Sequence, residues 1–340
     1  MSPSPSRAEL HAFLARHQRF VLTTHVNPDG DAIGSEVGFA RWLASMGKTV
    51  WILNDSPTPQ AFQYLLEGQT FDVYDEARCE QRFAEADALV VLDTSNRQRI
   101  GRLAHHLDRH LLPIAIVDHH ATHDGFGQVN VIETDQAATA SLVFDLMREA
   151  GHAPDALSAE ALYVGLATDT GNFRYSNTDT RAHEMAAAMI RAGVRPEVTH
   201  ERIHATAPAG RIRFFGEALA ALQMLEGGRI ALLEVAPEQF TRHGLSGPDT
   251  EGLVDMPRAI LGVEVVALVS EVDPGKVKVS LRSSGRLSID GVCQKYGGGG
   301  HAHAAGVQMR CSREEAKARI VPELSRLLAE LDAAAGGGGR

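Results

Sequence analysis

The fold of this chain is decided by residues 25–35, which read His-Val-Asn-Pro-Asp-Gly-Asp-Ala-Ile-Gly-Ser. The apolar stretch Phe20–Thr24 precedes them and predicts a strand, and the amphipathic stretch Ala32–Met46 predicts the helix that follows. The proline and the glycine allow a tight turn between the two. An imidazole and two carboxylates therefore stand directly after a strand, where open α/β sheets bind their ligands.

The same alternation of apolar and amphipathic stretches continues through the first half of the chain. Further strands are predicted at Thr49–Leu53, Ala88–Asp93 and Ile114–Asp118. Further helices are predicted at Ala138–Ala150, Ser158–Thr168 and Thr180–Ala192. This pattern predicts an α/β domain with a parallel sheet and helices on both faces.

The pattern changes between Arg195 and Gly210, where Pro196 and Pro208 bracket a short helical segment. The strands predicted after this point are Arg229–Val235, Val263–Ser270 and Lys276–Arg282, before a glycine run and a last helix near Arg313–Leu331. We therefore predict a smaller α+β domain in the second half. The expected boundaries are 1–195 for the first domain, 196–211 for a linker, 212–333 for the second domain and 334–340 for a disordered tail.

The composition is that of an ordinary globular protein, with 44% hydrophobic and 22% charged residues among 340. The formal net charge of −10 argues against a protein that grips long duplexes through many phosphates, but it is compatible with a short substrate. The three cysteines show no close pairing, no apolar run approaches the length of about 18 residues that crosses a bilayer, and the N-terminus lacks a secretory pattern. A cytoplasmic protein is expected.

Three further segments deliver acids and histidines to the same region. The strand ending at Leu92 is followed by Asp93, the next strand ends in Asp118-His119-His120, and Asp169 lies near the end of a predicted helix. Taken alone, Asp29 is also explained as a turn residue and Asp31 as a helix N-cap. Together, carboxylates this close repel one another unless a cation neutralises them. Mixed oxygen and imidazole ligands suit manganese, magnesium or a similar divalent ion.

These segments, in this order, resemble the four motifs of the DHH phosphoesterases. Residues 297–306, Gly-Gly-Gly-Gly-His-Ala-His-Ala-Ala-Gly, are similar to the signature of the DHH-associated substrate domain, and Arg282-Ser283 also fits that domain. The resemblance spans roughly residues 20 to 310. The two-domain layout resembles the nanoRNases of the family, which often also remove a phosphate from 3′-phosphoadenosine 5′-phosphate.

The resemblance implies two divalent metal ions, with manganese expected. One ion is held by His25 and Asp29, the other by Asp31, His119 and Asp169, and Asp93 bridges both. Asp118 is expected to orient a histidine, and His120 to contact the scissile phosphate. The residues expected to contact the substrate are Arg282, Ser283, Gly299, Gly300 and His301.

Some features leave alternatives open. Arg97 and Arg99 are predicted phosphate contacts for which an exposed surface role is about equally well supported. The family often has a lysine shortly after the histidine of the glycine loop, whereas this chain has Ala302 and His303, so one phosphate contact is missing or replaced. A homodimer formed through the first domain is a further alternative.

Rival functions also remain. The expected substrates are short single-stranded oligonucleotides or nucleotide bisphosphates, with no long duplex and no membrane partner. An inorganic pyrophosphatase, a cyclic-dinucleotide phosphodiesterase and a catalytically silent nucleotide-binding protein are the alternatives. Residues 200–204 match the zinc-binding pattern His-Glu-x-x-His, but they lie in the expected linker and are interpreted as a polar helix. The pair His105-His106 is interpreted as surface residues.

Overall fold

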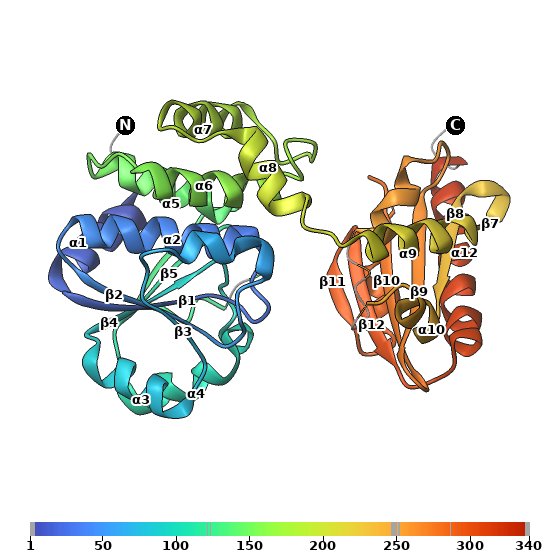
Figure 1. Cartoon of the computed structure of the whole chain (residues 1–340), viewed down its shortest axis with the longest axis horizontal. Coiled ribbons are helices and arrows are strands. Elements are labelled where there is room, and N and C mark those ends of the chain that lie inside the picture. The colour runs from blue at the N-terminus through green and yellow to red at the C-terminus, as the bar shows by residue number, and fades with distance from the viewer. Residues whose placement is uncertain are drawn as a thin grey trace. The chain divides into compact units, whose positions relative to one another are not determined.

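Six parallel strands form the sheet of the first half, in the order β3-β2-β1-β4-β5-β6 (Figure 1). Their bounds are β1 Arg19–Thr23, β2 Thr49–Asn54, β3 Phe71–Val73, β4 Ala88–Leu92, β5 Ile114–Asp118 and β6 Val129–Ile132. The structure is a computed structural model and describes residues 4–120, 122, 124–245, 250, 252–285 and 287–336. The predicted parallel α/β sheet is confirmed, and its strand order reverses between β1 and β4.

Helices cover both faces of this sheet, as predicted (Figure 1). One face carries α1 Pro5–Arg16, α2 Gly30–Ser45 and α5 Thr139–Glu149, and α6 Ala156–Asp169 and α7 Thr180–Arg191 pack on these helices. The other carries α3 Glu76–Glu85, the 3-10 helix η2 Arg97–Leu103 and α4 Ala104–His110. Large apolar side chains are fully buried on each side of the sheet, among them Phe39 and Trp42 on the first face and Phe83 on the second.

Two glycines of α2 bring it close to α6. A Cβ at Gly34 would lie 2.3 Å from the carbonyl oxygen of Ala161, and one at Gly38 would lie 2.5 Å from Leu162 Cδ2. Since real Cβ atoms essentially never approach a backbone oxygen so closely, a larger residue at Gly34 would push the helices apart. The close packing holds the start of α2 against the end of α6, which is where Asp31 and Asp169 lie.

The second unit is built on a sheet of order β11-β12-β10-β9-β8-β7, antiparallel except for the parallel pair β8–β9. Its strands are β7 Gln223–Leu225, β8 Ile230–Val235, β9 Val265–Asp273, β10 Lys276–Ser283, β11 Gly299–His301 and β12 Ala304–Met309. One face packs against α11 Asp290–Gln294 and α12 Arg313–Gly336. The other packs against α9 Ala209–Ala220, α10 Pro237–Arg242 and the 3-10 helix η4 Leu253–Ala259. The predicted α+β character of the second half is confirmed.

The two units divide between Thr206 and Ala207, inside the segment 196–211 that was expected to be a linker. That segment contains α8 Pro196–His204 and the first residues of α9. At the C-terminus, α12 continues to Gly336, so the expectation of a disordered tail from 334 is wrong for 334–336, and 337–340 lie outside the described residues. Across the described ranges, no helix is long and apolar enough to cross a membrane.

Candidate metal centre

The predicted ligands meet at the carboxyl edge of the first sheet because they follow three adjacent parallel strands. His25 follows β1, Asp93 directly follows β4, and His119 directly follows β5. Asp31 comes from the first turn of α2 and Asp169 is the last residue of α6. These side chains form groups of potential ligands whose donor atoms lie within 4.8 Å of one another.

The first group contains His25, Asp29 and Asp93. Nε2 of His25 lies 3.5 Å from Asp93 Oδ2 and 4.0 Å from Asp29 Oδ2. The other ring nitrogen, Nδ1, lies 2.9 Å from the carbonyl oxygen of Val26, a contact in which Nδ1 donates. In a neutral ring this leaves the Nε2 lone pair facing two carboxylates, an arrangement that a cation between them would stabilise.

The second group contains Asp31, His119 and Asp169. Nε2 of His119 lies 3.3 Å from Asp169 Oδ2 and 3.8 Å from Asp31 Oδ2, while Nδ1 lies 3.2 Å from the carbonyl oxygen of Gln136. Both histidines are thus oriented by a backbone carbonyl, as is usual for metal-ligating histidines. The donor set and its orientation fit a divalent cation.

Asp93 lies between the two groups. Its Oδ2 faces His25, and its Oδ1 lies 3.8 Å from Nε2 of His119. Its backbone has φ 57°, a left-handed conformation that is uncommon outside glycine and concentrates at functional sites. Thr139 donates its hydroxyl to Oδ1 of Asp93 at 2.8 Å. Sequence reasoning missed Thr139, which lies in no motif.

Asp29 and Asp31 also have structural partners. Asp29 is the N-cap of α2 and accepts hydrogen bonds from the amides of Asp31 and Ala32, so the capping role considered for Asp31 belongs to Asp29. The carboxylate of Asp31 accepts the backbone amides of Thr139 and Ala140, at 2.6 and 2.9 Å. Asp31 thereby satisfies the first amides of α5, which has no capping side chain of its own.

The electrostatics of the cluster are those of a cation site. Burial raises the pKa of Asp31, and burial together with the neighbouring charges of Asp31 and Asp29 raises that of Asp93 well above its ordinary range. Burial and the charge of Asp31 raise the pKa of Asp169 to about 8. The common cause is desolvation of like charges, which a bound divalent cation would offset.

Asp118 lies fully buried beside the ligands and orients His120. Its Oδ1 accepts from Nδ1 of His120 at 2.8 Å and from the backbone amides of His119 and His120. Burial alone would raise the pKa of Asp118, but the hydrogen bonds and charge of His120 hold it below its ordinary value.

A polar pocket of about 430 Å³ adjoins the centre. It is lined by Thr94, Ser95, Asn96, Arg99, His120, Thr122 and Asp124. The structure therefore places Arg99 and His120 around one cavity directly beyond Asp93. Arg97 is not among its lining residues and instead forms an ion pair with Asp108.

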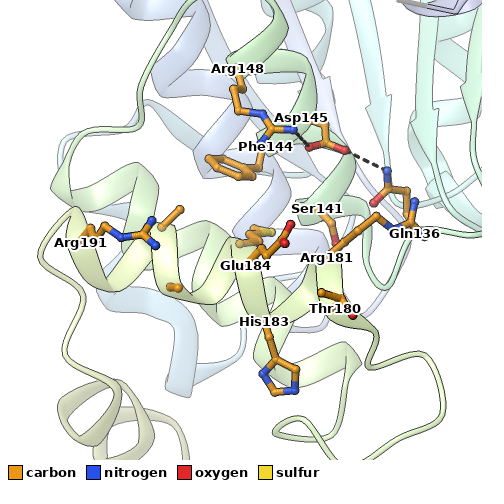
Figure 2. Close-up of a pocket in the computed structure, with 13 residues that line it drawn as sticks. Gln136, Ser141, Phe144, Asp145, Arg148, Thr180, Arg181, His183, Glu184 and Arg191 are labelled. Atoms are coloured by element: carbon orange, nitrogen blue, oxygen red, sulfur yellow. Dashed lines mark hydrogen bonds and ion pairs between the residues drawn. The ribbon is translucent and has the colours of Figure 1, made fainter. Parts of the chain in front are cut away.

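A larger pocket of about 720 Å³ lies between α5 and α7 (Figure 2). Its charged side chains are partly paired: Arg148 forms an ion pair with Asp145, which also lines the pocket, and Arg181 forms one with Asp135 outside it. None of the predicted metal ligands lines it. Gln136 links this pocket to the metal centre, because its side chain donates to Asp145 and its carbonyl oxygen faces His119.

In the second unit, the predicted substrate residues already have structural partners. Nε of Arg282 lies 3.5 Å from Asp255 Oδ1 and its side chain is 30% exposed. Ser283 is buried, donates to the carbonyl oxygen of Leu287 and lies 3.1 Å from Nδ1 of His303. This burial counts against direct contact of Ser283 with a substrate. The contacts of Arg282 and Ser283 with a substrate stay predictions.

The glycine loop is partly explained by strand pairing. A Cβ at Gly300, where φ is 144°, would lie 2.3 Å from the carbonyl oxygen of Ala304 on β12, next to Ala305, which is opposite Gly300 in the strand pairing. A Cβ at Gly299 would meet nothing within 4 Å. The side chain of His301 lies outside the described part of the chain. Gly300 is therefore required by the fold, whereas Gly299 is not.

Two other histidine motifs have different outcomes. Within the described ranges, His200 and His204 belong to no group of three potential metal ligands, although their rings lie 4.6 Å apart on α8. The interpretation of His105-His106 as surface residues holds for His105 and is wrong for His106, which is 1% exposed. His106 is buried because α4 packs its ring against Phe83.

An α/β domain with carboxylates and histidines gathered at the carboxyl edge of its sheet, joined to a separate α+β domain, defines a divalent-cation-binding class of protein. Residues 19–166 match the DHH family, N-terminal domain, and residues 228–339 match the DHHA1 domain. The bifunctional oligoribonuclease and PAP phosphatase NrnA of Thermus thermophilus is 30% identical over 289 residues, which are 85% of this chain and 83% of that protein. This chain belongs to the DHH family.

Two further comparisons agree with this assignment. The Bacillus subtilis protein of the same name is 25% identical over 329 residues, covering 95% of this chain and 99% of that one. The crystal structure of an exopolyphosphatase-related protein from Bacteroides fragilis superposes with a TM-score of 0.90 at 24% identity, over 96% of each chain. That likeness establishes a shared fold.

Proposed function

We propose that this chain is a divalent-cation-dependent phosphoesterase that hydrolyses short oligoribonucleotides to mononucleotides and 3′-phosphoadenosine 5′-phosphate to AMP. The observation that carries the proposal is the convergence of three carboxylates and two histidines around Asp93. The names of the relatives from Thermus thermophilus and Bacillus subtilis support the choice of substrates.

In the proposed mechanism, His25, Asp29 and Asp93 would hold one cation, and Asp31, His119 and Asp169 would hold the other. The orientation of the two oxygens of Asp93, one toward each group, supports a bridging role for this residue. Bound divalent cations would act as Lewis acids on a phosphoryl oxygen and lower the pKa of water. Manganese is the ion that we propose.

The protein's own groups would position the phosphate. Because Asp118 holds Nδ1 of His120, contact with a phosphate oxygen falls to Nε2 of that ring, which lines the 430 Å³ pocket. Arg99 lines the same pocket and would contribute a positive charge. We propose Arg282, Gly299, Gly300 and His301 as further substrate contacts in the second unit.

The proposal is tested by hydrolysis assays on metal-stripped protein, with manganese, with magnesium and with chelator. The substrates are a 5′-phosphorylated RNA dinucleotide, a long RNA, 3′-phosphoadenosine 5′-phosphate, a cyclic dinucleotide and pyrophosphate. Manganese-dependent turnover of the dinucleotide and of the bisphosphate, with slow cleavage of the long RNA, is expected. Pyrophosphate as the best substrate would instead indicate a pyrophosphatase, and binding without turnover would indicate a nucleotide-binding protein.

A further inference from the structure

A further group of potential metal ligands, outside the metal centre, lies on the face of the first sheet covered by α3 and α4 (Figure 1). Glu80 comes from α3, and His106 and His110 come from α4. The two histidines are four residues apart, so they lie on one side of the helix, one turn from each other. One donor atom from each of the three residues lies within 4.8 Å of the other two.

The donor atoms face one another without forming hydrogen bonds. Oε2 of Glu80 lies 3.3 Å from Nδ1 of His106, and Oε1 of Glu80 lies 3.1 Å from Nε2 of His110. Nδ1 of His106, Nε2 of His110 and Oε2 of Glu80 are shielded from solvent and have no hydrogen-bond partner among the described residues. His106 is only 1% exposed, so its unpartnered Nδ1 is not in contact with bulk solvent.

We propose that Glu80, His106 and His110 bind a divalent transition-metal ion of the zinc type, separate from the catalytic centre. For bond lengths of 2.0–2.2 Å in a tetrahedral site, ligand atoms lie about 3.3–3.6 Å apart. The two Glu80–histidine contacts, each made by a different oxygen of the carboxylate, measure 3.3 and 3.1 Å, so a small rotation of Glu80 would bring one oxygen toward both histidines. Two imidazoles and one carboxylate favour zinc over magnesium or calcium, and leave one coordination position for water.

The surroundings support the same assignment. Oε2 of Glu76 lies 3.7 Å from Nε2 of His106, on the side of the ring away from Glu80, where a carboxylate would orient a ligating imidazole. The stacked ring of Phe83, 5.2 Å from that of His106, holds the same orientation. The competing cation is Arg109, whose Nη1 lies 3.2 Å from Glu80 Oε2. Its side chain is 57% exposed and also contacts Glu76, so it can leave Glu80 when a metal ion enters.

A metal ion here would cross-link α3 to α4. Because α4 directly follows η2, which carries Arg99 of the substrate pocket, the cross-link would stabilise the segment that forms one wall of that pocket. The site is thus expected to add stability without taking part in the reaction.

The experiment is zinc binding by equilibrium dialysis and elemental analysis on the metal-stripped full chain. The wild type is compared with His110→Gln, with Glu80→Gln and with the control His105→Gln, which changes the exposed neighbouring histidine. We expect His110→Gln and Glu80→Gln each to lose one zinc equivalent at micromolar zinc and to lose the corresponding rise in melting temperature, while their phosphoester hydrolysis with manganese is unchanged. Glu76→Gln is expected to weaken binding about 10–100-fold.

A variant of the proposed catalytic centre distinguishes zinc bound there from zinc bound at Glu80, His106 and His110. In Asp93→Asn, the zinc equivalent that depends on His110 should remain. The proposal is overturned if His110→Gln and Glu80→Gln, both folded by circular dichroism, bind as many zinc ions with the same affinity as the wild type. It is also overturned if the control His105→Gln loses the same equivalent, since binding would then depend on scattered surface histidines.

Discussion

The hydroxyl of Thr139 donates to Asp93 across 2.8 Å, which ties the first turn of α5 to the carboxylate at the middle of the metal centre. The backbone amide of the same residue donates to Asp31 at 2.6 Å. One buried residue therefore orients two carboxylates that face different ligand groups.

Replacing Thr139 by valine should lower turnover. Valine has nearly the same shape but no hydroxyl, so Oδ1 of buried Asp93 would lose its donor and its fixed orientation. Removal of such an outer partner of a metal ligand typically costs about 10–100-fold in activity or metal affinity. We expect kcat to fall by that factor with little change in KM, measured on the dinucleotide. Thr139→Ser keeps the hydroxyl and should stay near wild type; equal losses in both variants would contradict this role.

Asp93→Asn should abolish hydrolysis and leave the fold intact. Asparagine tolerates the left-handed backbone at this position, whereas Asp93→Ala adds strain to the loss of the ligand. Metal ions contribute several kcal/mol to such reactions, so we expect kcat to fall at least about 1000-fold. The exposed Asp135 offers the control Asp135→Asn, which should keep its activity. Circular dichroism checks the fold, and an active Asp93→Asn enzyme would rule out the bridging role.

The glycine loop offers a pair of substitutions that separate folding from substrate binding. Gly300→Ala places a Cβ 2.3 Å from a backbone oxygen and should destabilise the second unit, seen as a lower melting temperature. Gly299→Ala meets no protein atom within 4 Å and should fold normally. If the backbone at Gly299 approaches a phosphate, that variant should raise KM severalfold. An unchanged KM would remove Gly299 from the substrate contacts.

The buried carboxyl group of Glu36 should make the free energy of unfolding depend on pH. It is fully buried, and burial raises its pKa to about 8, although a hydrogen bond from Asn54 offsets part of the effect. The folded state therefore keeps a proton that the unfolded chain releases near its ordinary pKa of about 4.3. The contribution of Glu36 to the free energy of unfolding is complete below that pH. It is lost as the pH rises toward 8, by about 1.4 kcal/mol per pH unit.

Glu36→Gln should remove this slope. At pH 7 we expect the variant to be about 3–4 kcal/mol more stable than the wild type, with the difference nearly absent at pH 4.5. Urea unfolding between pH 4.5 and 8.5 in chelator measures it, and the difference between the two proteins cancels the titration of the metal centre. The exposed Glu67 provides the control Glu67→Gln, which should leave the slope unchanged. A parallel pH profile for Glu36→Gln would show that Glu36 is ionised in the folded protein.

The strands that were predicted best from the sequence are those whose burial produces a continuous run of apolar residues. The strand predicted at Ile114–Asp118 is β5 itself, because central parallel strands are buried on both faces and read as apolar runs. The edge strand β3 has three residues, and β6 contains Asn130, so neither produces such a run. Both were missed.

In the candidate site, too, some residues could be predicted from the sequence and others could not. Its candidate ligands His25, Asp93 and His119 could be proposed because each follows a predicted strand. Gln136 could not, because it orients His119 through a backbone carbonyl that every residue possesses. The burial of His106 could not be predicted either, because a pair of histidines is normally interpreted as polar and exposed. Only the packing of α4 on Phe83 reveals that His106 is buried.

The strand order has a consequence for how this protein folds. Thr23 at the end of β1 pairs with Val91 near the end of β4, although β2, β3 and α3 intervene in the sequence. His25 and Asp93 therefore become neighbours only after this non-local pairing, a slow step in the folding of sheets of this kind. Asp169 joins them only when α6 has docked on α2. The complete ligand set therefore exists only after these non-local contacts have formed, so the uptake of cations during refolding would report when the central strands and α6 are in place.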